Sequence, residues 1–209
     1  MKVLLVGYGK VNKIIHNLIK DDVVGIITRK EVINNQPDII IDFSHPDLLE
    51  KTIYYSDKFN IPILIGTTGY NEKQIELIKN YSNYVPTLIS ENFSVGVFLI
   101  KRFLSINIKE LDLYKKLIIE THNKSKKDTP SGTAIMLSKL LNTNNIISKR
   151  VPDDITSHDI VFSNLLEQIK ISHNIYNKEV FAKGALLCAE WLIKQKSGFY
   201  SIEDYFYEI

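Results

Sequence analysis

Cysteine is nearly absent from this chain, which has one in 209 residues. The single thiol, Cys188, excludes an internal disulfide and a cysteine-based metal site, so a reducing cytosol is the expected compartment. No apolar run approaches the roughly 18 residues that a membrane-spanning helix needs. Met1 and Lys2 lead straight into a short strand-like run, which does not resemble a signal peptide. We therefore expect a soluble, cytoplasmic protein with no membrane partner.

An excess of charge of one sign is also missing, because 26 basic residues stand against 24 acidic ones. The formal net charge of +2 is too even for a nucleic-acid footprint spread over the surface. We therefore expect no nucleic-acid partner, and any positive patch must be local. With 44% hydrophobic and 24% charged residues the composition is ordinary for a globular protein, and the length fits one large domain or two small ones.

Spacings typical of metal sites are a third absence. The histidines show no pairing at i and i+4 and no carboxylate companion spaced for zinc. They stand at positions 16, 45, 122, 158 and 173. We therefore expect no metal.

The N-terminus reads as strand, glycine turn and helix. Val3 to Val6 is an unbroken apolar run, the sequence G-Y-G-K-V-N follows it, and apolar residues then recur at helical spacing. In dinucleotide-binding folds the first glycine makes the tight turn, the second admits the pyrophosphate, and the helix N-terminus supplies amide donors. Asn12 stands where a third glycine is usual, so a plain strand-to-helix turn is the alternative.

The end of the second expected strand, Val23 to Ile27, bears on the choice of cofactor. It is followed by Thr28-Arg29-Lys30. An arginine here suits the 2′-phosphate of NADP, whereas an acidic side chain suits the free ribose of NAD. The sequence therefore leans towards NADPH, while Glu31 keeps NADH open and an ordinary basic loop is the alternative. The link to the next strand is too short for a helical crossover.

Three further strand-like runs end in small or polar residues. The runs are 39–41, 61–65 and 85–89, and the loops after them read D-F-S-H-P, G-T-T-G and S-E-N-F-S. Helix-like segments lie at 47–58 and 71–80. Because ligands of open parallel sheets bind beyond the carboxyl ends of the strands, three such loops in succession favour a binding crevice.

The pattern changes after Phe93. An amphipathic stretch over 95–113 precedes a strand-like run, and segments 159–164 and 168–174 alternate apolar and polar residues, as antiparallel strands do. A final helix is expected over 181–195. We predict an α/β protein with an N-terminal Rossmann-type doubly wound parallel sheet and a smaller α+β domain with a mainly antiparallel sheet.

The stretch from Glu120 to Ala134, E-T-H-N-K-S-K-K-D-T-P-S-G-T-A, gathers ionisable groups between a strand-like and a helix-like run. His122 is best suited to give or take a proton near neutral pH. The amides of residues 131–133 at the helix start form an anion site suited to a carboxylate, to which Lys126 adds a positive charge. Each feature alone has a structural explanation, as a solvated loop or a helix entry, but their coincidence favours a site.

This stretch closely resembles the substrate-site motif of dihydrodipicolinate reductases (4-hydroxy-tetrahydrodipicolinate reductases), E-x-H-H-x-x-K-x-D-x-P-S-G-T-A. The runs G-Y-G-K-V-N, D-F-S-H-P, G-T-T-G, E-N-F-S-V-G-V, F-A-K-G-A-L-L-C-A-E-W-L and G-F-Y are similar to further motifs of that family, in the same order. The resemblance implies NAD(P)H-dependent reduction of 4-hydroxy-tetrahydrodipicolinate or dihydrodipicolinate to tetrahydrodipicolinate in the diaminopimelate route to lysine. It also implies a homo-oligomer, a tetramer.

The resemblance further implies a division of labour. Residues 1–92 and 179–209 would form the dinucleotide-binding domain, and residues 93–178 the substrate-binding and oligomerisation domain. His122 would be the general acid, and Lys126 would bind substrate and take part in catalysis. The implied substrate-binding residues are Asn123, Ser131, Gly132, Thr133 and Lys178. The implied cofactor-binding residues are Gly7, Gly9, Lys10, Val11, Arg29, Gly66, Thr67, Thr68, Asn92 and Phe93.

Three departures from the family pattern stand out. Asn123 replaces the usual second histidine, Lys178 replaces an arginine, and the element that keeps Ser148, Arg150 and His158 has lost its glycines. The segment after Leu141 is also short, which predicts a reduced second domain. Two alternatives therefore stay open, a non-catalytic nucleotide-binding paralogue and a related oxidoreductase acting on another amino or imino acid.

Overall fold

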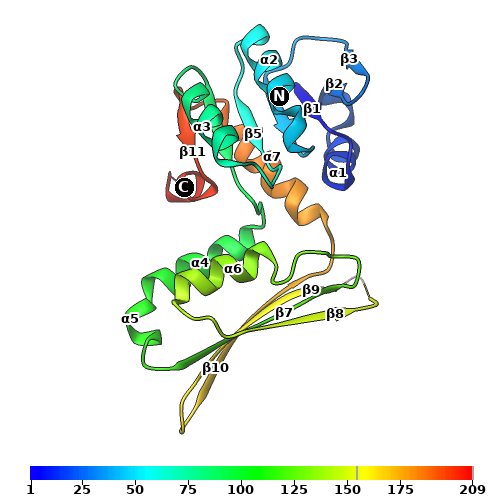
Figure 1. Ribbon diagram of the computed structural model, residues 1–209. Helices are drawn as coiled ribbons and strands as arrows, with labels where there is room; N and C mark the ends of the chain where they lie inside the picture. Colours follow the sequence, from blue (N-terminus) through cyan, green and yellow to red (C-terminus); the bar gives the residue numbers. More distant parts are fainter. Residues whose placement is uncertain (154, 209) are drawn as a thin grey trace. The chain divides into compact units, whose positions relative to one another are not determined.

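The computed structural model describes residues 1–153 and 155–208, and the chain divides into two compact units (Figure 1). The first unit joins Met1–Phe93 to Lys178–Ile209, so the C-terminal segment returns to the domain that the N-terminus begins. The second unit is Ser94–Asn177. None of the helices within the described ranges is both long and apolar enough to cross a membrane.

The first unit is built on a seven-stranded sheet of order β11-β6-β5-β4-β1-β2-β3. Its strands are β1 (Val3–Val6), β2 (Val23–Ile27), β3 (Glu31–Ile33), β4 (Ile39–Asp42), β5 (Ile63–Ile65), β6 (Pro86–Ile89) and β11 (Gly198–Tyr200). Every neighbouring pair is parallel except β2 with β3. The sheet is wound outwards from β1 in both directions, which confirms the predicted Rossmann-type arrangement.

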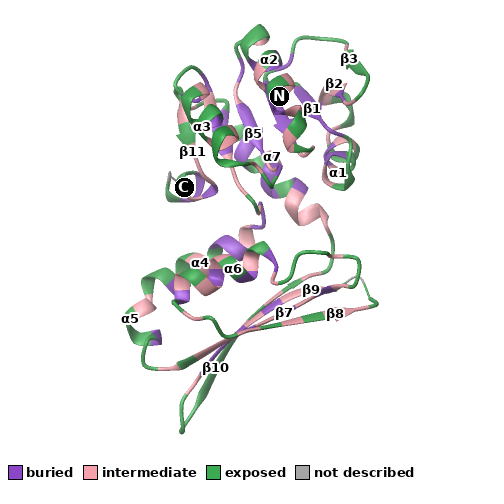
Figure 2. Ribbon diagram, in the orientation of Figure 1, coloured by how far each residue is buried: buried purple, intermediate pink, exposed green. Residues whose placement is uncertain are grey.

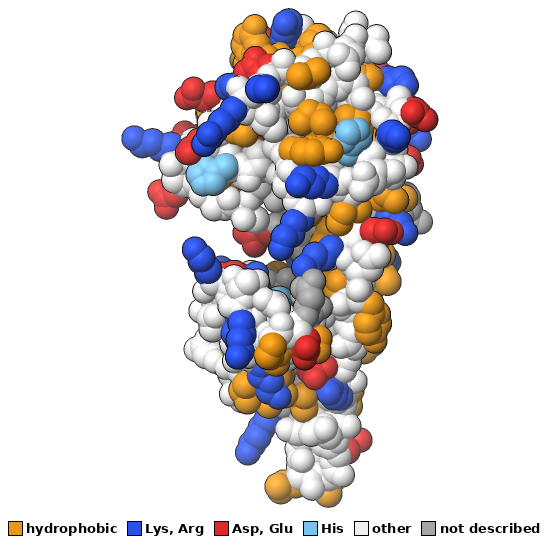
Figure 3. Space-filling model, turned by 90° about the vertical axis from the view of Figure 1, so that its right-hand side faces the viewer, with side chains coloured by type: hydrophobic (Ala, Val, Ile, Leu, Met, Phe, Trp, Pro, Cys, Tyr) orange, Lys and Arg blue, Asp and Glu red, His pale blue; other side chains and the backbone are white. Residues whose placement is uncertain are grey.

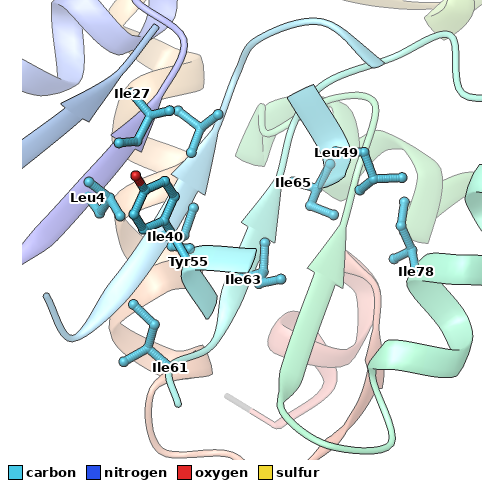
Figure 4. Packing of buried hydrophobic residues seen from close by; sticks show 10 residues of the cluster. Leu4, Ile27, Ile40, Leu49, Tyr55, Ile61, Ile63, Ile65 and Ile78 are labelled. Atoms are coloured by element: carbon cyan, nitrogen blue, oxygen red, sulfur yellow. The ribbon is translucent and has the colours of Figure 1, made fainter. Parts of the chain in front are cut away.

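Helices cover this sheet, as its continuous apolar strands require. Leu49 and Tyr55 of α2 and Ile78 of α3 pack with strand residues such as Leu4 and Ile63 (Figure 4). On the other side α7 contacts β5, β6 and α1. The helices are α1 (Lys10–Leu18), α2 (Leu49–Phe59), α3 (Glu72–Tyr81), α7 (Glu179–Leu192) and α8 (Ile202–Glu208), with 3-10 turns at Lys20–Asp22 and Pro46–Leu48. The central strands are buried while the outer helix surfaces are exposed (Figure 2).

The second unit has a four-stranded sheet of order β10-β9-β7-β8. Its strands are β7 (Lys115–Asn123), β8 (Ile146–Val151), β9 (Thr156–Ser163) and β10 (Gln168–Ile175). The pair β7 and β8 is parallel, and the other two pairs are antiparallel. Helices α4 (Val95–Ile106) and α6 (Gly132–Leu141) lie together over one face, and the short α5 (Ile108–Leu111) follows α4. The predicted separate and mainly antiparallel sheet is therefore confirmed.

Three strands were missed by the sequence prediction, one of which is β11, in a stretch after the final expected helix for which no strand was expected. The short link after β2 contains β3, an edge strand with two exposed residues, whose pattern carries no buried run to reveal it. Strand β8 reads I-I-S-K-R-V, and its charged residues hid it. The stretch 95–113, expected as one amphipathic segment, divides into α4 and α5 at Asn107.

Helix α7 approaches the end of the first segment so closely that only glycine fits at the contact. A Cβ on Gly184 would lie 1.8 Å from the carbonyl oxygen of Phe93, which is backbone and cannot turn aside. Phe93 is itself 1% exposed and packs edge-on against Phe43, with ring centroids 5.5 Å apart. This contact ties the returning helix to the sheet.

Gly184→Ala should therefore destabilise the protein, although alanine is the better helix former by about 1 kcal/mol. We expect a loss of about 2 kcal/mol or more in the free energy of unfolding, because overpacking against fixed backbone outweighs helix propensity. Urea unfolding monitored by circular dichroism measures it. Lys183→Ala, at an exposed neighbouring position of α7, is the control and should change stability little; equal stability of both variants would contradict the close contact.

Candidate functional site

The helix-covered face of the second sheet changes from apolar to ionisable within two residues. Four isoleucines lie side by side across the strands, from Ile146 of β8 through Ile118 and Ile160 to Ile171 of β10. Two positions along, the next row on the same face contains Ser148, Glu120, His158 and His173. The isoleucine row packs under α4 and α6, whereas the polar row lies near the N-termini of both helices. A core layer thus gives way to a site.

A buried ion-pair network stands at the centre of this row. Glu120 is fully buried, and its Oε2 accepts a hydrogen bond from Nδ1 of His122. Its Oε1 lies 2.9 Å from Nη1 of Arg150. Nη2 of Arg150 donates to the carbonyl of Asp128 at 2.7 Å and to the hydroxyl of Thr129 at 2.9 Å. One guanidinium therefore joins the carboxylate behind His122 to the loop that leads into α6.

The charges in this network act on each other. Burial alone would raise the pKa of Glu120, but hydrogen bonds from Ser148 and Arg150 and the charge of His122 outweigh it, so this pKa lies below its usual value. Burial lowers the pKa of His122, and the charges of Lys126 and Arg150 lower it further, while Glu120 alone among these neighbours raises it. Glu120 thus stays ionised, and the pKa of His122 lies below its usual value but by less than it would without the Glu120 carboxylate.

His158 and His173 extend the row beyond the network. The His158 ring meets that of His122 edge-on at 5.2 Å and stacks on that of His173 at 6.3 Å. Nε2 of His158 lies 3.3 Å from Oγ of Ser131, and Nε2 of His173 lies 3.3 Å from Oγ of Ser94. Burial, with the charges of the two neighbouring histidines, lowers the pKa of His158 to about 4, so it is neutral near pH 7. The predicted site did not include either residue.

The predicted carboxylate cradle begins at the N-terminus of α6. Ser131 is the N-cap, is 2% exposed, and accepts a hydrogen bond from the amide of Ala134 at 3.3 Å. Gly132, the first residue of the helix, is exposed. The first turn of a helix presents backbone amides and the positive end of the helix dipole, as an anion site needs.

Lys126 lies in the loop between β7 and α6, and Asn123 is the last residue of β7. Nζ of Lys126 is 2.8 Å from Oδ2 of Asp128, and its side chain is 32% exposed, so it can move to meet an anion. Asn123 uses its amide within the loop, donating to the carbonyls of Pro152 at 2.8 Å and Asp153 at 3.2 Å. Asn123 therefore holds the ends of β7 and β8 together, and contact with substrate is for it a prediction only.

The sequence argument against a metal overlooked one cluster. Ligand atoms of Glu120, His122 and His158 lie within 4.8 Å of one another, brought together across strands where no spacing along the chain reveals it. The cations Arg150 and Lys126 flank these three groups and disfavour a divalent ion there. We assign no metal.

The glycine turn of the first unit follows β1. Gly7 has a positive φ of 82°, and a Cβ there would lie 2.7 Å from the carbonyl oxygen of Phe43, so the turn requires glycine. Asn12, which stands in place of the usual third glycine, has a structural role of its own. Its buried Nδ2 donates to the carbonyls of Val6 at 2.8 Å and Gly7 at 2.9 Å. Gly9 is the N-cap of α1, and Lys10 and Val11 are its first two residues.

A pocket of about 610 Å³ opens beyond the carboxyl ends of β4 and β5. It is lined by residues 43–47 and 66–69 together with Asn71 and Gln74, and so includes the predicted Gly66, Thr67 and Thr68. Gly66 is required here, because its Cβ would lie 2.0 Å from the ring of Phe43. Two further predicted cofactor residues are Asn92 and Phe93. Phe93 is buried, so its ring packs inside the first unit. The carbonyl of Asn92 accepts a hydrogen bond from the hydroxyl of Ser90 at 2.8 Å.

Asp42 fixes the walls of this pocket and was not predicted. It is fully buried and accepts hydrogen bonds from the hydroxyls of Ser44 at 2.5 Å, Thr52 at 2.7 Å and Thr67 at 2.7 Å. Burial raises its pKa despite these donors. The hydroxyl of Thr67 is therefore committed to holding two loops together. The sequence signal that could have identified Asp42 was an aspartate directly after the apolar run 39–41.

Arg29 and Glu31 differ in their surroundings. Glu31 is bonded to Nζ of Lys51 at 2.6 Å and to the hydroxyl of Tyr55 at 2.5 Å, which occupies its carboxylate. Arg29 is exposed beyond β2.

Lys178, the remaining predicted residue, is the N-cap of α7 in the first unit. Figure 3 shows Lys and Arg side chains spread over this face of each unit with acidic side chains among them.

Comparison with known proteins decides the family. Residues 1–93 match the family described as "Dihydrodipicolinate reductase, N-terminus", and residues 96–206 match "Dihydrodipicolinate reductase, C-terminus". The chain belongs to the dihydrodipicolinate reductase family. The predicted resemblance is therefore confirmed over nearly its whole length.

Relatives within the dihydrodipicolinate reductase family cover nearly the whole chain. A protein of Thermosipho africanus named 4-hydroxy-tetrahydrodipicolinate reductase is 39% identical, over 98% of this chain and 97% of its own length. One of the same name from Staphylococcus carnosus is 31% identical, over 98% and 99%. A solved structure, "Dipicolinate bound Dihydrodipicolinate reductase from Paenisporosarcina sp. TG-14", shares the fold with a TM-score of 0.80 at 18% identity, over 96% and 97% of the two chains. The first match is aligned over 210 residues and nearly its full length, so a chain about this short occurs in another family member.

The stability of this dihydrodipicolinate reductase family member should depend on pH through His158. Its pKa is about 4 in the folded chain against 6.5 ordinarily, so between these values the unfolded chain binds more protons. Stability should thus fall as pH drops from about 6.5 towards 4, by up to about 3 kcal/mol from this group. Urea unfolding near pH 7.5 and near pH 5 measures it. The loss should be smaller in His158→Gln and unchanged in His16→Gln; equal losses in all three would contradict burial of a neutral His158.

Proposed function

We propose that this chain is a 4-hydroxy-tetrahydrodipicolinate reductase, reducing the cyclic unsaturated dicarboxylate to tetrahydrodipicolinate in the diaminopimelate route to lysine. The observation that carries the proposal is the buried pair of Glu120 and His122 beside the N-terminus of α6. It supplies a proton donor next to a carboxylate-binding helix end. The named relatives, matched over nearly their full length, support the same reaction.

His122 is the proton donor. Its Nδ1 is bonded to Glu120, so the proton that reaches substrate comes from Nε2. Asn123 cannot titrate, and His158 is neutral with its Nε2 beside Ser131, so His122 is the one of these three that can donate the proton, with Lys126 taking part in catalysis beside it. Because the carboxylate behind it is already in place, the donor needs no reorganisation as charge develops on the ring.

Lys126 and the amides of residues 131–133 hold a substrate carboxylate. A solved relative is described as dipicolinate-bound, and dipicolinate is a ring dicarboxylate of the same class. The helix N-terminus fixes the carboxylate in direction, and Lys126, once drawn from Asp128, adds a full charge. Lys178 is proposed for the second carboxylate, as a weaker donor than the arginine it replaces.

The family implies a nicotinamide cofactor, and bound nicotinamide would supply the hydride. The residues present fit it: Gly7 allows the close turn, and Gly9, Lys10 and Val11 begin the helix whose amides would face the pyrophosphate. Gly66, Thr67, Thr68, Asn92 and Phe93 are proposed for the nicotinamide end, with Thr67 contributing through its backbone because its hydroxyl serves Asp42. The homotetramer implied by the resemblance stays a prediction.

The reductase assay decides between the proposal and its alternatives. The freshly formed product of dihydrodipicolinate synthase is mixed with the protein and NADPH or NADH, and absorbance at the reduced nicotinamide band is followed. Consumption is expected with at least one cofactor. Cofactor binding without consumption would favour a non-catalytic paralogue, and consumption only with other amino or imino acids would favour the related oxidoreductase.

His122→Asn should reduce kcat about 100-fold or more, because the general acid is lost while the site stays polar. Cofactor binding, measured by nicotinamide fluorescence, should be unchanged. The matched control is His16→Asn, a histidine of the first unit that bonds Tyr8 at 2.7 Å and should turn over normally. Full turnover of His122→Asn would contradict the assignment of His122 as the general acid.

We propose NADPH as the preferred cofactor, because Arg29 is exposed beyond β2 and the carboxylate of Glu31 is occupied by Lys51 and Tyr55. Arg29→Ala should raise the KM for NADPH about tenfold and leave that for NADH nearly unchanged, since one charge-assisted contact to the 2′-phosphate is removed. Steady-state kinetics with both cofactors measure this, with Lys20→Ala as an exposed control. An equal effect of Arg29→Ala on both cofactors would show that this residue does not read the phosphate.

A further inference from the structure

In the proposed reaction the fully buried Glu120 does not touch the substrate, yet it is placed as a functional group would be. No solvent reaches it, and it is shared between a titrating side chain and a permanently charged one. Burying a carboxylate is costly unless it is paired and hydrogen-bonded. Stability of the fold alone does not explain a carboxylate at this position. An apolar side chain here would extend the neighbouring layer of isoleucines without the cost of burying a charge.

We propose that Glu120 is a positioning residue for His122, and that Arg150 couples it to the substrate loop. The carboxylate fixes the imidazole with its proton on Nδ1, which leaves Nε2 as the ring nitrogen that exchanges a proton with a ligand. The part of this inference that concerns catalysis rests on the proposed function. The pairing itself concerns the protein alone.

Register explains why this pair can be built. Glu120 and His122 are two residues apart on β7. Their side chains therefore point to the same face of the sheet, the one that the helices cover. Arg150 lies opposite His122 on β8, and from there its guanidinium reaches the Glu120 carboxylate at 2.9 Å. Because Arg150 also bonds Asp128 and Thr129, a shift of the loop before α6 would disturb the carboxylate behind the proton donor. Binding at the helix end and proton donation are thereby mechanically joined.

The charges around His122 make Glu120 decisive for its protonation. Strand β8 contributes the cation Arg150, and the loop contributes the cation Lys126 with Asp128 beside it. Strand β9 contributes His158, with His173 behind it on β10. Among the residues that the structure describes, only Glu120 places a buried negative charge in contact with the ring. Its removal should therefore lower the proton affinity of His122 and shift its working range to lower pH.

The test is the titration of His122 followed by NMR in protein labelled with ¹⁵N-histidine, in which the His122→Asn spectrum identifies the signal. In the wild type the neutral ring should be the Nδ1-protonated tautomer. In Glu120→Gln the affinity of the ring for a proton should fall about tenfold or more. The alkaline limb of kcat should move to lower pH by the same amount, with KM changed less than about threefold.

The control is Asp159→Asn, which removes a carboxylate from β9 that is bonded to Lys170 at 2.9 Å. Its His122 titration should match the wild type. An unchanged His122 titration in Glu120→Gln would overturn the proposal. If Glu120→Gln fails to fold, the wild-type tautomer decides alone, because a neutral ring protonated on Nε2 contradicts the pairing.

Failure of the proposed function is distinguishable from failure of this inference. A changed titration in a protein with no reductase activity would support the pairing and reject the substrate. Normal reductase activity with an unchanged titration would support the function and reject the role of Glu120.

Discussion

The second unit depends on one constraint: the negative charge of a carboxylate that is buried away from solvent must be compensated by neighbouring positive groups and hydrogen-bond donors. Glu120 meets it with Arg150 and His122, and all three come from the parallel pair β7 and β8. The isoleucine row beside them supplies the apolar layer, and the network stands where that layer stops. A break in the hydrophobic pattern of the sheet is therefore also the origin of the site.

Much of this was predictable from the sequence, because local patterns specified it. The apolar runs of the first unit, the glycine turn at Gly7 and the helix entry at Ser131 were each read from adjacent residues. The cluster around Glu120 was not, because His158 and Arg150 reach it only through strand register. Strand β8 was itself hidden by Lys149 and Arg150, whose charges look like those of a loop.

The departures from the family pattern have physical explanations in two instances. Asn12 replaces a glycine, and its side-chain amide bonds the carbonyls that the turn exposes. Asn123 replaces a histidine and bonds the loop at the end of β8, where the usual glycines are missing. Both asparagines serve the backbone where the family pattern is broken. The ionisable groups that remain, His122 and Lys126, are the ones on which the proposed reaction depends.

The central claim is that the N-terminus of α6 and His122 form one site for a ring dicarboxylate. Titration of ¹⁵N-labelled protein with dipicolinate, followed by two-dimensional NMR, tests it most directly. The account predicts saturable shifts of the Gly132 and Thr133 amides and of the His122 ring, all with the same dissociation constant. Saturable binding that leaves these three signals unmoved would contradict it.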